Sequence, residues 1–238
     1  MKIKFFHIAP AVLLILAAAC KKDNYDAPTS TLRGALLYKG DSIGVEYNQV
    51  PFNVFQPGYG KSGGAITGTF APDGTYSILV FDGNYQFTMP KNQGPFLWKE
   101  LTASARDTLK VGLQGSQTVN IEVTPYYMVR NQQLTVSGGK VVAAFDIEKV
   151  ITDAALAKNI QTVVLYINKT KFVSGASNDN IASASVAGTA LPADLKNISL
   201  NVTIPAISPT QNYVFARVGV RITGVEDMIF SPLKKLTF

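Results

Sequence analysis

The chain has little of the chemistry on which most enzymes and metal proteins depend. Its 238 residues include one histidine and one cysteine. His7 and Cys20 both lie close to the N-terminus, so the rest of the chain contains neither residue type. Ser-His-Asp and Cys-His nucleophilic pairs, histidine metal sites and intramolecular disulfides are therefore excluded. No GxGxxG precedes a helical pattern and no GxxxxGK[ST] is present, so the phosphate-binding loops of nucleotide enzymes are absent too.

Cys20 completes a lipoprotein-type signal. A basic start is followed by an apolar run at 5–16 and by three alanines at 17–19. Because this run is shorter than the roughly 20 apolar residues that span a bilayer, we expect residues 1–19 to be cleaved and Cys20 to be acylated. Ala17 occupies the place where such signals usually carry leucine. A plain secretory signal that leaves Cys20 as a free thiol therefore stays open as the alternative.

Charge is sparse and scattered in the mature chain. Removing Lys2 and Lys4 reduces the 22 Lys and Arg to 20, against 16 Asp and Glu, so the net charge is +4. Nucleic-acid binders cluster basic residues on one face or interleave them with aromatics, and no such cluster occurs here. We expect no nucleic-acid partner and no cofactor. Anchoring would come from lipid on Cys20 rather than from charge.

Strand periodicity dominates after a short polar tether at 20–30. Segments of five to nine residues alternate apolar and polar side chains between Gly, Pro, Asn and Asp turns, which is typical of β-sandwiches. In the clearest strand, Val214 to Ile222, alternate apolar residues would face a core while Arg217 and Arg221 face water. Pro125 ends a strand, which places a boundary between β domains at 31–124 and 125–238.

Turn chemistry predicts finer detail. Asp-Gly pairs at 73–74 and 82–83 favour hairpins, so residues 65–89 are expected to form a three-stranded meander. Residues 152–159 are expected to form the only helix, capped by Thr152, and 174–192 a long loop. The strands expected in the N-terminal domain are 31–38, 50–55, 65–71, 74–81, 84–89 and 119–123.

Several motifs occur in an order that resembles a family of uncharacterised two-domain lipoproteins of the Bacteroidetes. They are Cys20 followed by Asp23-Asn24-Tyr25-Asp26 and Pro28, Gly58-Tyr59-Gly60, Asp73-Gly74-Thr75-Tyr76, Phe81-Asp82-Gly83-Asn84-Tyr85, Gly94-Pro95-Phe96 and Ala216-Arg217-Val218-Gly219-Val220. The resemblance implies an all-β fold, with a prealbumin-like sandwich of the carboxypeptidase regulatory type followed by an immunoglobulin- or fibronectin-type sandwich.

The same resemblance implies a cellular context. Family members tend to be encoded with starch-utilisation-type outer-membrane transporters and glycan-binding lipoproteins, which become the expected partners. No activity is established for the family, so no catalytic residue is carried over. The expected location is the outer membrane, with the protein facing the cell exterior.

Two aromatic residues are the candidate ligand contacts. Trp98 is the only tryptophan and lies beside a turn, where it is placed to stack on a sugar ring. Its large apolar area also suits packing at the join between the domains. Tyr59 lies between two glycines on an expected loop. Tyr126 and Tyr127, at the domain boundary, are interpreted as packing residues of the joint.

The acidic residues give little indication of a catalytic site. A glycosidase needs two carboxylates about 5–10 Å apart, and Asp73, Asp82 and Asp107 are available. Asp73 and Asp82 occur in Asp-Gly turns, where hydrogen bonds to the local backbone explain them. Asn178-Asp179-Asn180 lacks the spacing of a calcium loop and is interpreted as a solvated turn. We therefore expect a non-enzymatic protein.

Two functional hypotheses follow. The first is a lipid-anchored, surface-exposed accessory protein of a glycan-uptake system that binds a polysaccharide or oligosaccharide. The second is a non-catalytic structural module that holds or spaces neighbouring outer-membrane proteins. The first predicts affinity for saccharides, and the second predicts a protein partner without such affinity.

Overall fold

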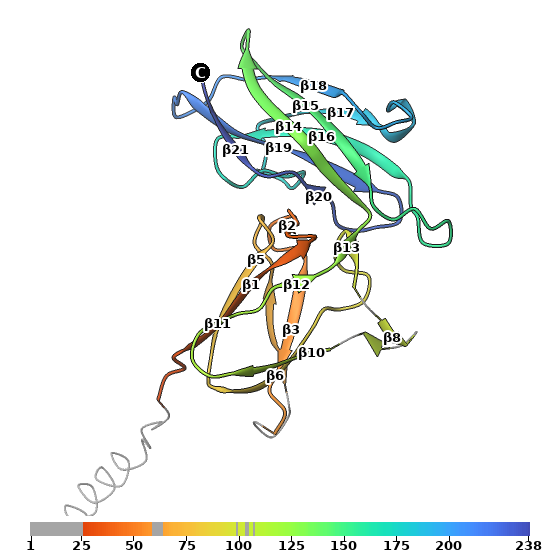
Figure 1. The fold of residues 1–238 in the computed structure, drawn as a ribbon. Helices are drawn as coiled ribbons and strands as arrows, with labels where there is room; N and C mark the ends of the chain where they lie inside the picture. The colour runs from red at the N-terminus through yellow and green to blue at the C-terminus, as the bar shows by residue number, and fades with distance from the viewer. Residues whose placement is uncertain (1–25, 59–63, 99, 103–104, 107) are drawn as a thin grey trace, which may run out of the picture.

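The protein contains two β domains stacked end to end (Figure 1). The computed structural model describes residues 26–58, 64–98, 100–102, 105–106 and 108–238. Cys20, Tyr59 and Asp107 lie outside these described residues. The fold is almost entirely β, as the alternating pattern predicts. Within the described ranges, no helix has the length and apolar character needed to cross a bilayer.

The N-terminal domain is a sandwich built around β1 (Ser30–Tyr38). This strand pairs antiparallel with β5 and β2 and parallel with β11 and β12. Its partners are β2 (Asp41–Ser42), β5 (Thr75–Val80), β11 (Gln117–Thr118) and β12 (Ile121–Glu122). The second sheet, in spatial order, contains β10 (Leu109–Leu113), β6 (Gly83–Thr88), β3 (Pro51–Phe55) and β4 (Ile66–Thr69). The remaining short pairs are β7 (Phe96–Leu97) with β13 (Thr124–Pro125) and β8 (Glu100–Thr102) with β9 (Ala105–Arg106).

The C-terminal domain is a second sandwich. One sheet, in spatial order, contains β14 (Tyr127–Ser137), β15 (Lys140–Lys149) and β18 (Ile198–Thr203). The other contains β17 (Ala182–Ala187), β16 (Ile160–Asn168), β19 (Tyr213–Ile222), β20 (Ile229–Phe230) and β21 (Lys234–Thr237). The alternation predicted for β19 is present on its inner face, where Val214, Val218 and Val220 are fully buried.

The predicted meander over 65–89 is wrong. β4 pairs with β3, β5 pairs with β1, and β6 pairs with β3 and β10, so the three strands do not pair with one another. The Asp73-Gly74 turn instead carries the chain from one sheet to the other. Gly74 has φ 81°, and a Cβ there would lie 2.2 Å from the Ile43 carbonyl oxygen. Alternation identifies a strand, but the shape of the core decides which strand lies beside it.

Two further local predictions are wrong. Residues 152–159 form no helix: the segment makes a single turn, in which the amide of Ala157 donates to the Asp153 carbonyl over 2.7 Å. One turn is too short to offset the cost of helix nucleation. The expected loop 174–192 contains β17 and a 3-10 turn, η2 (Gly188–Ala190). β17 consists mostly of alanine and serine, whose small side chains give only a weak apolar–polar alternation, so the strand was not recognised in the sequence.

Arg217 on β19 was expected to face water, and it is only 2% exposed. Its guanidinium donates to the carbonyls of Val45 (3.0 Å) and Pro72 (3.4 Å) in the N-terminal domain, and its Nε donates to Val173. The guanidinium also lies 3.7 Å from the ring centroid of Phe230. Around Arg217, the outer face of β19 is therefore covered by Val173 and Phe230 of its own domain together with the N-terminal domain. Burial lowers the pKa of Arg217 to about 10, so the cation persists at neutral pH.

Three more contacts join the domains. The amide of Phe230 donates to the Gly44 carbonyl over 2.9 Å, in an isolated β-bridge. The amide of Gly94 donates to the Asp227 carboxylate over 2.7 Å, and burial raises the pKa of that carboxyl. Arg130 pairs with Asp41 across the boundary. β2 accordingly lies directly beneath β20 (Figure 1).

We expect Arg217→Met to destabilise the protein by roughly 1–3 kcal/mol, because the carbonyl groups of Val45 and Val173 lose the buried guanidinium that donates to them. Urea unfolding followed by Trp98 fluorescence and by circular dichroism measures the change. Arg221→Met, on the same strand but less buried, is the control and should change stability by no more than about 0.5 kcal/mol. Equal stability of the two variants would contradict the interdomain role of Arg217.

Candidate functional site

Two grooves open at the junction of the domains. The Trp98 groove consists of two cavities of about 780 and 300 Å³, both lined by Leu97, Trp98 and Leu156. The Phe172 groove is a cavity of about 670 Å³ and shares no lining residue with the first. Its lining residues are Ser42, Gly44, Ala71, Pro72, Asp73, Lys171, Phe172, Phe215, Ser231, Pro232, Leu233 and Lys235. All three cavity volumes are in the range typical of small-ligand sites.

Trp98 lines both cavities of its groove and is only 8% exposed. Its ring meets Phe87 edge to face, with 6.2 Å between ring centroids. Phe87 belongs to the aromatic core of the N-terminal domain and stacks on Phe52 at 5.0 Å. The indole therefore presents only a small area to a ligand, and most of it packs inside the protein. The ligand role of Trp98 stays a prediction.

The tyrosines at the boundary are buried beside Trp98. The amide of Tyr126 donates to the Pro95 carbonyl over 3.2 Å, and Lys158 Nζ lies 5.6 Å from the Tyr126 ring centroid. The Tyr127 hydroxyl donates to the Lys158 carbonyl over 2.6 Å. Burial raises the pKa of both tyrosines. Their role is to pack the joint, as their position in the sequence indicates.

The Phe172 groove carries the exposed aromatic surface of the junction. Phe172, which follows β16, is 44% exposed, and Tyr47 of the N-terminal domain is 50% exposed. Their ring centroids lie 4.8 Å apart, in an edge-to-face pair that crosses the domain boundary. Tyr47 also lines a neighbouring cavity of about 630 Å³ on the N-terminal domain. The pair thus joins two concave surfaces into one extended site.

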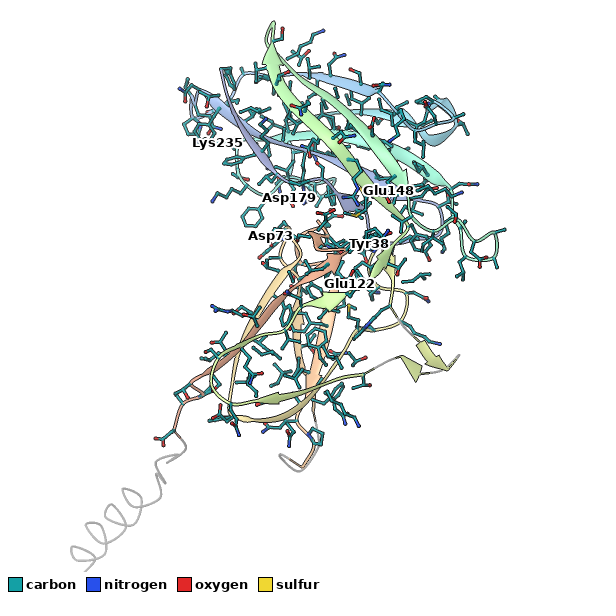
Figure 2. All side chains as sticks on the ribbon, in the orientation of Figure 1. Tyr38, Asp73, Glu122, Glu148, Asp179 and Lys235 are labelled. Atoms are coloured by element: carbon teal, nitrogen blue, oxygen red, sulfur yellow. The ribbon has the colours of Figure 1, made fainter. Side chains whose placement is uncertain are left out.

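Charged groups border the Phe172 groove. Lys171 and Lys235 line it and form no ion pair with any described residue. Lys235 Nζ lies 3.8 Å from the ring centroid of Tyr213. Asp73 is the only acidic residue among the described lining residues. In Figure 2, Asp73 and Lys235 lie to the left of Glu122, which lines the Trp98 groove.

Asp73 and Asp82, the described acidic residues considered for catalysis, are both held by hydrogen bonds within the N-terminal domain. Asp73 accepts hydrogen bonds from the Thr75 amide (3.0 Å) and hydroxyl (2.7 Å). Asp82 accepts from the Ser30 hydroxyl and the Gly115 amide, and these two bonds lower its pKa. The Asp73 bonds are those of a turn residue. The expectation of local backbone bonds for Asp82 is wrong, because its two partners lie far away in the chain and the carboxylate joins separate segments of the N-terminal domain.

The Asn178-Asp179-Asn180 segment is also satisfied internally. Ser174 Oγ donates to Asp179 over 3.1 Å, and the Asn180 side chain donates to the Ser174 carbonyl over 2.9 Å. Among the residues with described positions, no group of three or more His, Cys, Asp and Glu side chains is arranged to hold a metal ion.

Sequence reasoning missed Tyr47, Phe172 and Arg217 as residues of the junction. Tyr47 and Phe172 lie in loops 125 positions apart in the chain, and no local pattern links them. The only available signal was an aromatic residue in a polar segment, as in Lys169-Thr170-Lys171-Phe172.

The fold and the interdomain grooves define a two-domain, all-β protein without a recognisable reaction centre in the described residues. Two family descriptions match successive parts of the chain: the "Protein of unknown function (DUF3823) N-terminal domain" at residues 30–124 and the "Domain of unknown function (DUF3823_C)" at 127–235. The chain belongs to the DUF3823 family. No protein of curated function matches it.

Solved structures share this fold. A DUF3823 protein from Parabacteroides merdae is 30% identical over 89% of this chain and 100% of its own, with a TM-score of 0.71. One from Bacteroides ovatus is 28% identical over 87% of this chain and 98% of its own, with a TM-score of 0.74. A protein from Bacteroides uniformis, described as a candidate carbohydrate binding protein, is 15% identical over 89% of this chain and 100% of its own, with a TM-score of 0.66.

We expect Trp98→Ala to lower the free energy of unfolding by about 3–5 kcal/mol, because it removes a buried indole from the aromatic core. Trp98→Phe, which keeps an aromatic ring, should cost less. Urea unfolding followed by circular dichroism measures both variants. Unchanged stability of Trp98→Ala would contradict the packing role and favour a ligand contact.

Proposed function

We propose that this protein is a lipid-anchored accessory lipoprotein of a glycan-uptake system and binds saccharides in the Phe172 groove. The observation that carries the proposal is the exposed Tyr47–Phe172 pair beside a concave surface built from both domains. The C–H groups of a pyranose ring form an apolar face that packs on aromatic rings. Ligand sites commonly combine such apolar walls with a few polar groups, which Asp73, Lys171 and Lys235 supply here.

The fold comparison adds context to this proposal. One structure of the same architecture is described as a candidate carbohydrate binding protein, but its 15% identity establishes only a shared fold. The proposal therefore depends on the aromatic surface of this chain. Phe172 and Leu233 both line the groove and are both exposed, and exposed apolar area of this kind is typical of interaction sites.

The arrangement of the domains suits an anchored binding protein. β1 starts at the end of the N-terminal domain that lies farthest from the C-terminal domain (Figure 1). A lipid on Cys20 would therefore attach the protein through this end. The Phe172 groove would then stand roughly one domain away from the membrane, open to ligands from outside.

A second candidate function is that of a spacer or scaffold for neighbouring outer-membrane proteins. The specific observation that favours it is the fixed domain junction, in which Arg217 and Asp227 are buried and hydrogen-bonded across the boundary. A spacer needs a defined angle between its parts. A folded protein that binds no saccharide, but crosslinks to one neighbouring membrane protein, would favour this function.

We expect Cys20 to carry the anchor. In a bacterial host that processes lipoproteins, the wild-type chain should incorporate an alkyne-labelled fatty acid and sediment with membranes, whereas Cys20→Ser should incorporate none. In-gel fluorescence after click labelling measures the difference. Labelling of Cys20→Ser, or an unlabelled wild type, would contradict the anchor.

We expect Phe172→Ala and Tyr47→Ala to weaken saccharide binding at least about tenfold, which corresponds to roughly 1.4 kcal/mol, while leaving the melting temperature nearly unchanged. Both side chains are substantially exposed, so little core packing is lost. A glycan array identifies the ligand and isothermal titration measures its affinity. Leu79→Ala is the matched control, because Leu79 is an exposed apolar residue on β5 that lines neither groove. Equal binding by all variants would place the site elsewhere.

A further inference from the structure

The cations of the Phe172 groove are available for a ligand. Lys171 lies in the loop after β16, and Lys235 lies on β21, so two separate elements bring positive charge to one cavity. Both side chains are exposed, and neither forms an ion pair with a described residue. A lysine left without a carboxylate partner in a concave site favours an anionic ligand.

The acidic groups nearby do not cancel this charge. Asp73 lines the groove, but one of its carboxylate oxygens already accepts two hydrogen bonds from Thr75. Glu46 and Asp179 lie close enough to raise the pKa of Arg217 by their charge, and neither lines the groove. The cavity is therefore lined by two cationic side chains and by a single carboxylate, which is held in a turn.

The aromatic walls restrict the kind of anion. Phe172 and Phe215 line the cavity together with the two lysines. Tyr213, whose ring centroid lies 3.8 Å from the Lys235 ammonium group, does not line the cavity but packs edge to face against Phe215. A small inorganic anion would leave these apolar walls uncovered. A saccharide with acidic substituents satisfies both features, because its ring covers the aromatic surface while its charge meets the lysines.

We propose that the Phe172 groove selects an acidic saccharide, whose carboxylate or sulfate groups are bound by Lys171 and Lys235. This inference rests on the proposed saccharide-binding function and specifies the substrate class of the same site. Because both lysines are exposed, the contribution of each is modest and is reduced by salt.

The test compares three ligands matched in length by isothermal titration with the purified full-length protein: a neutral oligosaccharide, an oligogalacturonate and a sulfated oligosaccharide. The wild type should bind at least one acidic ligand more tightly than the neutral one, and affinity should fall as salt is raised. Lys171→Gln and Lys235→Gln should each weaken acidic binding by about two- to fivefold, the range of exposed ion pairs. The two acidic ligands distinguish carboxylate from sulfate recognition.

Controls separate this inference from general charge effects and from the proposed function. Lys171→Arg should retain binding, and Lys140→Gln, at the exposed first residue of β15, should change nothing. Equal affinity for neutral and acidic ligands, with no effect of the lysine variants, would overturn the acidic preference and leave the saccharide-binding function intact. An equal loss in Lys140→Gln would show nonspecific attraction and also overturn it. Failure of the folded protein to bind any of the ligands, and of a glycan array to yield one, would overturn both.

Discussion

The buried guanidinium of Arg217 is the constraint on which the domain arrangement depends. A buried cation is costly unless its donors are satisfied, and here carbonyl groups of Val45 and Pro72 in the other domain accept them. Arg217 also contacts the buried apolar cluster of its own domain that includes Tyr166, Val173, Met228 and Phe230, through the Phe230 ring and the Val173 carbonyl. The contacts with Val45 and Pro72 join the domains in the observed arrangement, in which both grooves are lined by residues of the two domains.

This junction gives each groove a different character. The Trp98 groove lies over a tryptophan that packs into the N-terminal core through Phe87. The Phe172 groove has exposed rings on its rim and cations on two of its elements. Binding energy that comes from desolvating an aromatic surface is available only where that surface is exposed before the ligand arrives. The second groove therefore has the better chemistry for a saccharide.

Much of the fold could be predicted from the sequence, because alternation reports directly which residues face a core. The strands near 31–38, 50–55 and 84–89 all form. Strand pairing could not be predicted, since the Asp-Gly turn at 73–74 is compatible with a hairpin and with a crossing between sheets. The candidate site was harder to predict than the fold. Trp98 was identified from the sequence as a candidate ligand contact, but its side chain is mostly buried. Tyr47 and Phe172 form a pair in the structure, but no sequence signal links them.

The sequence by itself determined the β class, the family resemblance and the absence of histidine and cysteine chemistry after Cys20, because composition and period-two alternation are local properties of the chain. Only the tertiary structure decided that Arg217 is buried and that Tyr47 meets Phe172. The physical reason is that polar residues on the outer face of a strand such as β19 indicate solvent exposure when only the sequence is considered. Whether water or a second domain covers that face depends on contacts between residues far apart in the chain, such as Arg217 with Val45.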